Sequence, residues 1–209
     1  VGINNVAVTI TNSDGCKNSG NIQVVVKAIP SRPTLNVSEN PTCTGKTVTF
    51  TANGSGTFMW TGPNNFSSNQ QSPVLSNISL NAEGNYLCKV TVNGCTSEES
   101  SLFLEVNETP NITSITQTNP IMTCNGCEGI ITISGLQANT TYTVRFQKNG
   151  IPQPSQNIQT NSSGGLLVTN LCKGVYSNFD VILSNCTRNN ASIITLTDPT
   201  PPAKPITSQ

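Results

Sequence analysis

The feature that most constrains the fold of this chain is a strand–turn–strand pattern that occurs three times, at residues 6–30, 86–110 and 179–199. Each copy has an alternating apolar strand, a tight turn ending in cysteine, a second alternating strand and then proline. The turn cysteines, Cys16, Cys95 and Cys186, are 79 and 91 residues apart. This spacing is close to the roughly 100 residues of one two-sheet β-sandwich domain. We therefore expect related domains in succession, the last of them more diverged.

Proline-rich joints mark the expected boundaries, since proline fixes φ and removes a hydrogen-bond donor. They predict the C-terminal strands of a truncated domain at 1–29, one domain at 30–109, a β-sandwich repeat of a second type at 110–198, and a linker to a further domain at 199–209. Val1 is preceded by neither an initiator Met nor a signal peptide, so we expect the chain to begin within a longer protein.

The turn residues between the short apolar segments predict an all-β protein built from antiparallel sheets. Short alternating apolar runs are separated by Gly, Asn and Pro, and no stretch has a convincing helical period. The expected strands are 5–12, 20–28, 33–38, 46–52, 57–61, 73–79, 84–92, 100–106, 129–135, 140–148, 165–171, 175–184 and 191–197.

Charge and hydropathy argue against nucleic acid as a partner and against a membrane span. The chain has 28 asparagines but only 10 Lys and Arg and 10 Asp and Glu, and its net charge is zero. A protein without a basic cluster is not expected to bind nucleic acid. No run of 18 apolar residues occurs, so we expect no membrane span.

The cysteines point to the compartment. Eight cysteines occur in a chain with no histidine, and Cys124 and Cys127 form the only close pair. Zinc sites commonly need mixed Cys and His ligands or two such pairs. Scattered cysteines in a Thr- and Asn-rich β chain instead favour disulfides and an extracellular location.

Residues 31–107 resemble an immunoglobulin domain. Residues 45–52 resemble strand B, 57–60 resemble strand C with its core tryptophan, and 82–88 resemble the E–F corner and strand F. The expected fold class is therefore all-β, with tandem immunoglobulin-like antiparallel β-sandwich domains.

Three residues of this domain carry specific expectations. Trp60 should lie in the core, and Tyr86 should be the tyrosine-corner residue, with its hydroxyl bonded to nearby backbone. Ala52 stands where strand B would supply a cysteine, so the usual B–F disulfide is absent. Cys88 is then expected to be a buried free thiol that packs like valine.

The pattern is also similar to the repeats of giant secreted proteins of Bacteroidetes. In the middle domain the similarity rests on the segments 43–45, 60–66, 84–86 and 93–95. The last domain resembles a companion repeat of the same proteins, on the segments 123–129, 133–136, 139–144, 148–150 and 171–176. The resemblance implies export by the type IX route and display at the cell surface, often as adhesins or gliding-associated proteins.

Catalysis has little support in the sequence. Without histidine, Ser/His and Cys/His nucleophile systems are excluded. Glu98 and Glu99 are adjacent, so on a strand they face opposite sides. Asp14, Asp180 and Asp198 are isolated and form no calcium loop. We expect no catalytic residue, no metal site and no cofactor.

Aromatic side chains could bind sugar by stacking. Phe58 and Trp60 alternate on one strand and are expected to face the core. Phe66 lies in a loop rich in Gly, Pro and Asn and is the best candidate for a ligand contact. The alternative is that Phe66 anchors this loop against the sheet.

The disulfide pattern leaves two possibilities. A Cys127–Cys172 bridge is expected because both residues should lie at the same end of the last sandwich. For the rest, in-domain pairs of Cys43 with Cys95 and Cys124 with Cys186 are expected, although these positions lie at opposite ends in a standard immunoglobulin register. The alternative is that Cys43 pairs with Cys186 between domains, in which case Cys16 and Cys124 would pair outside the chain.

Three functions fit these features. The first is a structural or adhesive stalk or filament segment, with neighbouring repeats, surface glycans or other cells as partners. The second is a glycan- or protein-binding module attached to a secreted enzyme. The third is a protomer of a homo-oligomeric filament in which an incomplete domain accepts a strand from a neighbour.

Overall fold

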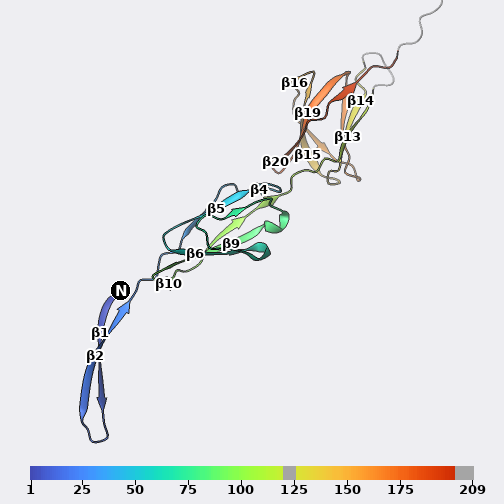
Figure 1. Cartoon of the computed structure of the whole chain (residues 1–209). Helices are drawn as coiled ribbons and strands as arrows, with labels where there is room; N and C mark the ends of the chain where they lie inside the picture. Colours follow the sequence, from blue (N-terminus) through green and yellow to red (C-terminus); the bar gives the residue numbers. More distant parts are fainter. Residues whose placement is uncertain (120–125, 201–209) are drawn as a thin grey trace, which may run out of the picture. The chain divides into compact units, whose positions relative to one another are not determined.

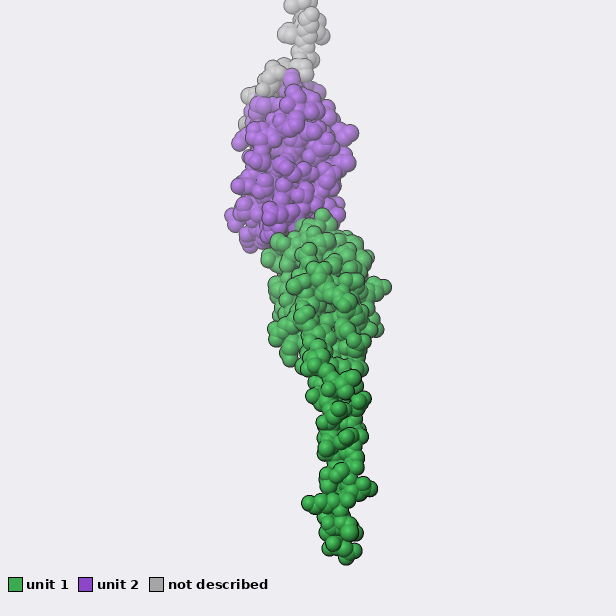
Figure 2. Space-filling view, turned by 90° about the vertical axis from the view of Figure 1, so that its left-hand side faces the viewer, with its two compact units in different colours: residues 1–106 green, residues 107–209 purple. Residues whose placement is uncertain are grey.

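The computed structural model describes residues 1–119 and 126–200, which form two compact units, Val1–Val106 and Asn107–Gln209 (Figure 2). The predicted all-β architecture is confirmed. The only helices among the described residues are two three-residue 3₁₀ turns, η1 (Pro63–Asn65) and η2 (Leu80–Ala82).

Unit 1 begins with a two-stranded antiparallel hairpin of β1 (Gly2–Thr11) and β2 (Lys17–Val26). The ladder runs without interruption from Gly2 opposite Val26 to Thr11 opposite Lys17. Every residue of both strands is exposed, and the ribbon shows no second sheet over either face of the hairpin (Figure 1). The hairpin is therefore a sheet without a core of its own.

The rest of unit 1 is a β-sandwich. The larger sheet has the order β10-β9-β6-β7, with β11 also paired to β9, and the smaller sheet has the order β3-β5-β8. The short strands β4 and β12 form a separate two-stranded sheet. The bounds are β3 (Thr34–Val37), β4 (Thr42–Cys43), β5 (Val48–Asn53), β6 (Thr57–Gly62), β7 (Phe66–Ser68), β8 (Val74–Leu75), β9 (Gly84–Val92), β10 (Cys95–Thr96), β11 (Ser100–Leu104) and β12 (Val106–Asn107).

The alternation of apolar residues builds this core. On β5, Val48, Phe50 and Ala52 are fully buried, and their neighbours in sequence are not. Tyr86 and Cys88 on β9 are buried in the same way. Because side chains on a strand point alternately to its two faces, each sheet offers one apolar face, and the two faces pack together. Each fully buried large apolar side chain contributes about 1.5–3 kcal/mol.

Unit 2 is a second sandwich, with a three-stranded sheet β13-β14-β18 and a sheet of order β16-β15-β19-β20 to which β17 and β21 add. The bounds are β13 (Ser114–Thr118), β14 (Gly129–Ser134), β15 (Thr141–Lys148), β16 (Ile151–Pro152), β17 (Gln156–Gln159), β18 (Leu166–Leu171), β19 (Gly174–Leu183), β20 (Cys186–Asn190) and β21 (Ile194–Leu196). Tyr142, Val144 and Phe146 of β15 all face its core, as their alternation predicts.

Asparagine has a backbone role that accounts for part of its abundance. Nine asparagines among the described residues have positive φ, including Asn93 before Gly94 in the turn between β9 and β10. Asparagine tolerates this left-handed conformation better than other side chains except glycine. Two of the nine, Asn170 and Asn178, lie where the strand registers of unit 2 shift at a β-bulge.

Candidate interaction surfaces and the disulfide site

One face of the β1–β2 hairpin is apolar. Its side chains lie at even-numbered positions, which share a face because strand side chains alternate. We call this surface the hairpin face; its aliphatic members are Val6, Val8, Ile10, Ile22, Val24 and Val26, which are 43–68% exposed. The opposite face is mostly polar. Aliphatic side chains gathered on one uncovered face indicate a surface built to pack against something.

The hairpin has the same register as the pair β9 and β11 in the sandwich of unit 1. Val6 lies opposite Ile22, as Tyr86 lies opposite Leu102. The next pairs along the strands, Val8 with Gly20 and Cys88 with Ser100, correspond in the same way. The hairpin face thus corresponds, position by position, to a face that the sandwich buries.

Tyr86 occupies the tyrosine corner, as predicted. Its hydroxyl donates to the carbonyl oxygen of Ala82 at 2.9 Å, and its side chain is fully buried. Burial raises the pKa of this phenol. A Cβ at position 62 would lie 2.6 Å from Cδ1 of the Tyr86 ring, so only glycine fits at that point of β6.

Unit 2 has a second tyrosine corner, which was not identified from the sequence. The Tyr176 hydroxyl donates to the carbonyl oxygen of Cys172 at 2.7 Å, and burial raises the pKa of its phenol. The acceptor lies four residues before the tyrosine, as in unit 1. The signal available in the sequence was the glycine two residues before each tyrosine, Gly84 and Gly174.

Cys88 is a buried free thiol, as predicted. It lies beside Trp60 in the β6–β9 ladder, and both side chains are fully buried in one core with Tyr86. Burial raises the pKa of the thiol to about 11. A thiol that stays protonated at neutral pH is a poor nucleophile, so Cys88 acts as a packing residue.

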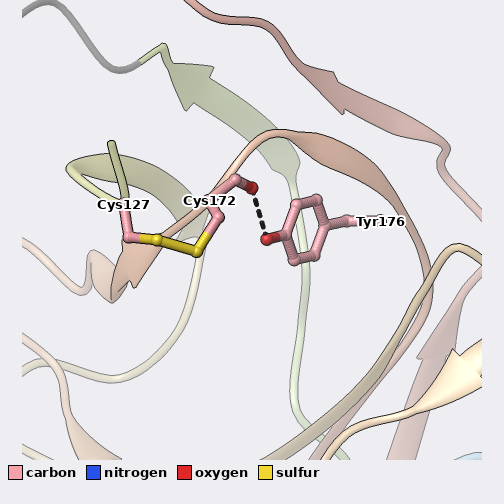
Figure 3. The surroundings of a disulfide bond; sticks show 3 residues. All are labelled: Cys127, Cys172 and Tyr176. Carbon is pink, nitrogen blue, oxygen red and sulfur yellow. Dashed lines mark hydrogen bonds between the residues drawn. A yellow bond between two sulfur atoms is a disulfide. The ribbon is translucent and has the colours of Figure 1, made fainter. Parts of the chain in front are cut away.

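The predicted Cys127–Cys172 disulfide is present (Figure 3). It joins the segment before β14 to the end of β18, across 45 residues of sequence. The Tyr176 hydroxyl bonds the backbone of the same Cys172, so the bridge and the tyrosine corner fix one short segment together (Figure 3). A structural disulfide indicates folding in an oxidising, extracellular type of compartment.

The expected Cys43–Cys95 pair is wrong. Cys95 has a free thiol, as does the exposed Cys16, whereas Cys43 and Cys186 are each disulfide-bonded. The two cysteines are too far apart to bond, because the start of strand B and the end of strand F lie at opposite ends of an immunoglobulin-like sandwich. Cys124, the expected partner of Cys186, lies outside the described residues. The between-domain pairing of Cys43 with Cys186 stays a prediction.

Phe66 lies at the start of β7 and is partly buried. Its ring centroid is 5.3 Å from that of Tyr86, in an edge-to-face arrangement, and 6.1 Å from that of Phe50. These are distances at which aromatic pairs attract each other. The geometry is that of a loop anchored on the core.

Charged groups lie on the surface in weak pairs. Glu98 pairs with Arg32 and Glu99 with Lys89, at 3.6 and 3.3 Å, and all four side chains are substantially exposed. Exposed pairs of this kind contribute little stability. Within residues 1–119 and 126–200 no cluster of three metal-binding side chains occurs. In the same ranges, no helix has the length and apolar character required to span a membrane.

Two facing sheets, antiparallel pairing and tyrosine corners define the class: the chain is an immunoglobulin-like β-sandwich protein. No family model and no curated protein matches it. Among solved structures, murine CEACAM1b is 13% identical, with a TM-score of 0.44 over 78% of this chain and 99% of the other. The human OSCAR ligand-binding domain is 14% identical, with a TM-score of 0.33 over 81% and 100%. Extracellular domains 3–5 of Drosophila OTK are 15% identical, with a TM-score of 0.39 over 91% and 68%.

Proposed function

We propose that this chain is a non-enzymatic structural and adhesive segment of a large bacterial extracellular protein, displayed at the cell surface as part of a stalk. In this proposal immunoglobulin-like sandwiches follow one another along the polypeptide, and residues 1–29 are the last two strands of one of them. The resemblance to repeats of secreted Bacteroidetes proteins supports the bacterial origin and the tandem arrangement.

The observation that carries the proposal is the hairpin face. Its residues correspond in register to a buried face of the unit 1 sandwich, yet Val6, Val8 and Ile10 are 44, 53 and 68% exposed. A two-stranded hairpin is marginally stable in water by itself. A second sheet that covers this face would give the hairpin the same kind of core that β9 and β11 share with β5.

The proposed mechanism is mechanical. In unit 2, the Cys127–Cys172 bridge closes a loop of 45 residues that cannot extend when the chain is pulled. In the chain-entropy description, a loop of this length gives roughly 4 kcal/mol of stabilisation. Proline-rich joints restrict bending, because proline holds the chain in extended conformations. Tension would then be transmitted through folded sandwiches.

The test compares residues 1–209 with a chain extended before Val1 by the roughly 50–70 residues that would, together with residues 1–29, complete one sandwich of about 80–100 residues. Native-state hydrogen exchange is measured for the amides of β1 and β2. We expect exchange at least about a thousandfold slower in the extended chain, because these amides would open only with the new sandwich. Equal exchange in both proteins would overturn the proposal.

A second candidate, the strand-accepting filament protomer, is favoured by the uncovered edges and face of the same hairpin. The same experiment separates the two. Protection that appears in residues 1–209 alone and increases with protein concentration would indicate a neighbouring molecule as the source of the missing strands.

A further inference from the structure

Unit 2 carries a polar surface hollow of about 390 Å³. Its floor is formed by Phe146, Leu171 and Tyr176, which belong to the core of the sandwich. One wall is the end of β18, and the other is the segment that joins β16 to β17 together with Gln156, the first residue of β17. A concave site of roughly 300–1,000 Å³ with an apolar floor and a few polar groups is typical of small-ligand sites.

A β-bulge shapes the first wall. Between Val168 and Leu171, β18 has one more residue than the facing part of β14, and Thr169 and Asn170 form the irregular step. Asn170 has φ of 58°. Bulges re-aim side chains and are frequent next to binding sites. Here the bulge places an exposed hydroxyl and an exposed carboxamide on the lining of the hollow.

The opposite wall adds two more carboxamides, Gln153 and Gln156, both partly buried. The Gln153 side-chain nitrogen donates to the carbonyl oxygen of Ile151 at 3.0 Å. The side-chain oxygen of Gln153 can then accept a hydrogen bond from a ligand. Gln156, Thr169 and Asn170 have no side-chain hydrogen bond to any described residue. A carboxamide both donates and accepts, so three of them around one hollow match vicinal hydroxyl groups, which also do both.

The charge in the hollow has one sign. Lys148 lines it, with Nζ 5.8 Å from the centre of the Tyr176 ring, and makes no ion pair within the described part of the chain. The described lining residues include no Asp or Glu. An unpaired ammonium in a partly buried position attracts an anionic group and repels a cationic one.

The walls are held in place before any ligand binds. Cys172 continues directly from β18 and is fixed by its bridge to Cys127, and its carbonyl oxygen accepts the Tyr176 hydroxyl (Figure 3). Binding groups carried by a braced segment lose little conformational freedom when they bind a ligand, and this favours affinity.

We propose that this hollow binds an acidic saccharide, with the carboxamides on its hydroxyl groups and Lys148 on its carboxylate. The site lies within unit 2, is distinct from Phe66 and is independent of how the hairpin face is covered. It goes beyond the stalk proposal, because it assigns unit 2 a ligand class of its own.

The test is a calorimetric titration of the full chain with trigalacturonate, and with its methyl ester as the uncharged control. We expect saturable binding of trigalacturonate and weaker binding of the ester. Gln156→Ala should weaken binding about fivefold to tenfold, as for one lost hydrogen bond. Lys148→Gln should remove the preference for the free acid. Both positions are partly exposed, so the variants should keep the thermal melting curve of the parent chain.

Asn157→Ala is the matched control. Asn157 is the next residue on β17, so its side chain points to the other face of the strand, where it contacts Thr143. It should bind like the parent chain. Absence of saturable binding at millimolar trigalacturonate, equal affinity for acid and ester, or unchanged binding by Gln156→Ala would each overturn the proposal.

Discussion

The hairpin β1–β2 and the pair β9–β11 have the same register and opposite surroundings. Val6, Val8 and Val24 are 44, 53 and 43% exposed. Their counterparts Tyr86, Cys88 and Leu104 are fully buried. The alternation of side chains is the same in both, so it decides which face of a strand is apolar. Burial requires a second sheet, which β3, β5 and β8 provide in one case only.

The difference has an energetic consequence. Full burial contributes about 1.5–3 kcal/mol for each large apolar side chain, and the hairpin face lacks this contribution along its whole length. The backbone hydrogen bonds of a two-stranded sheet do not replace it, because their net contribution in water is small. The same substitution should therefore have very different effects at corresponding positions.

The largest expected effect comes from a buried carboxylate. Cys88→Asp should destabilise the unit 1 sandwich by more than about 4 kcal/mol, since an unpaired charge would be placed in the core. Val8→Asp should change stability by less than about 0.5 kcal/mol, because that position is half exposed. Fluorescence of Trp60, the single tryptophan, reports the unfolding of unit 1 in denaturant.

Cys88→Val is the control for this pair, since it introduces the residue that the hairpin has at the corresponding position. It should remain close to the parent chain in stability, because it conserves size and hydrophobicity. If Val8→Asp destabilised the protein as strongly as Cys88→Asp, the hairpin face would be covered in solution and the comparison would fail.

A smaller effect is expected at the tyrosine corners, which the hairpin lacks because Val6 stands at the position of Tyr86. Tyr86→Phe keeps the ring but removes the bond to the Ala82 carbonyl oxygen, so unit 1 should lose about 1–2 kcal/mol. Trp60 fluorescence would show the loss, while Tyr176→Phe, in unit 2, should leave the Trp60 transition unchanged. No loss for Tyr86→Phe would mean that Ala82 finds another donor.

Most of the fold could be predicted from local patterns. Strands such as β9 and β15 have strict alternation, and each is followed by an Asn-Gly turn. Both strands and their buried faces were therefore predicted correctly. Strand β13 was missed, because Ser114–Thr118 has one apolar residue among five and its partner β14 decides its conformation. Register and pairing of this kind depend on the tertiary structure.

The sites were harder to predict, because they combine residues that are distant in sequence. The Cys127–Cys172 bridge was correct, since both positions lie at the same end of the sandwich. The Cys43–Cys95 pair was wrong: one cysteine before strand B and one after strand F suggested it, although the two positions lie at opposite ends of the standard immunoglobulin register. The unit 2 hollow was missed altogether, because a bulge at Asn170 leaves no simple sequence pattern.

The remaining comparison concerns pH and again sets Cys88 against its valine counterpart. Burial raises the pKa of the folded-state thiol from the ordinary value of 9.0 to about 11. The unfolded state therefore loses its proton first as the pH rises. The stability that depends on this thiol is complete below pH 9 and is lost between pH 9 and about 11.

The denaturation midpoint of the parent chain should thus fall relative to Cys88→Val over this range, and the two should differ by a constant amount from pH 6 to 8. Tyrosine and lysine titrate equally in both proteins and cancel in the difference. A constant difference up to pH 11 would show that the Cys88 thiol ionises as readily in the folded protein as in the unfolded chain, and that its surroundings are no drier than those of the exposed hairpin face.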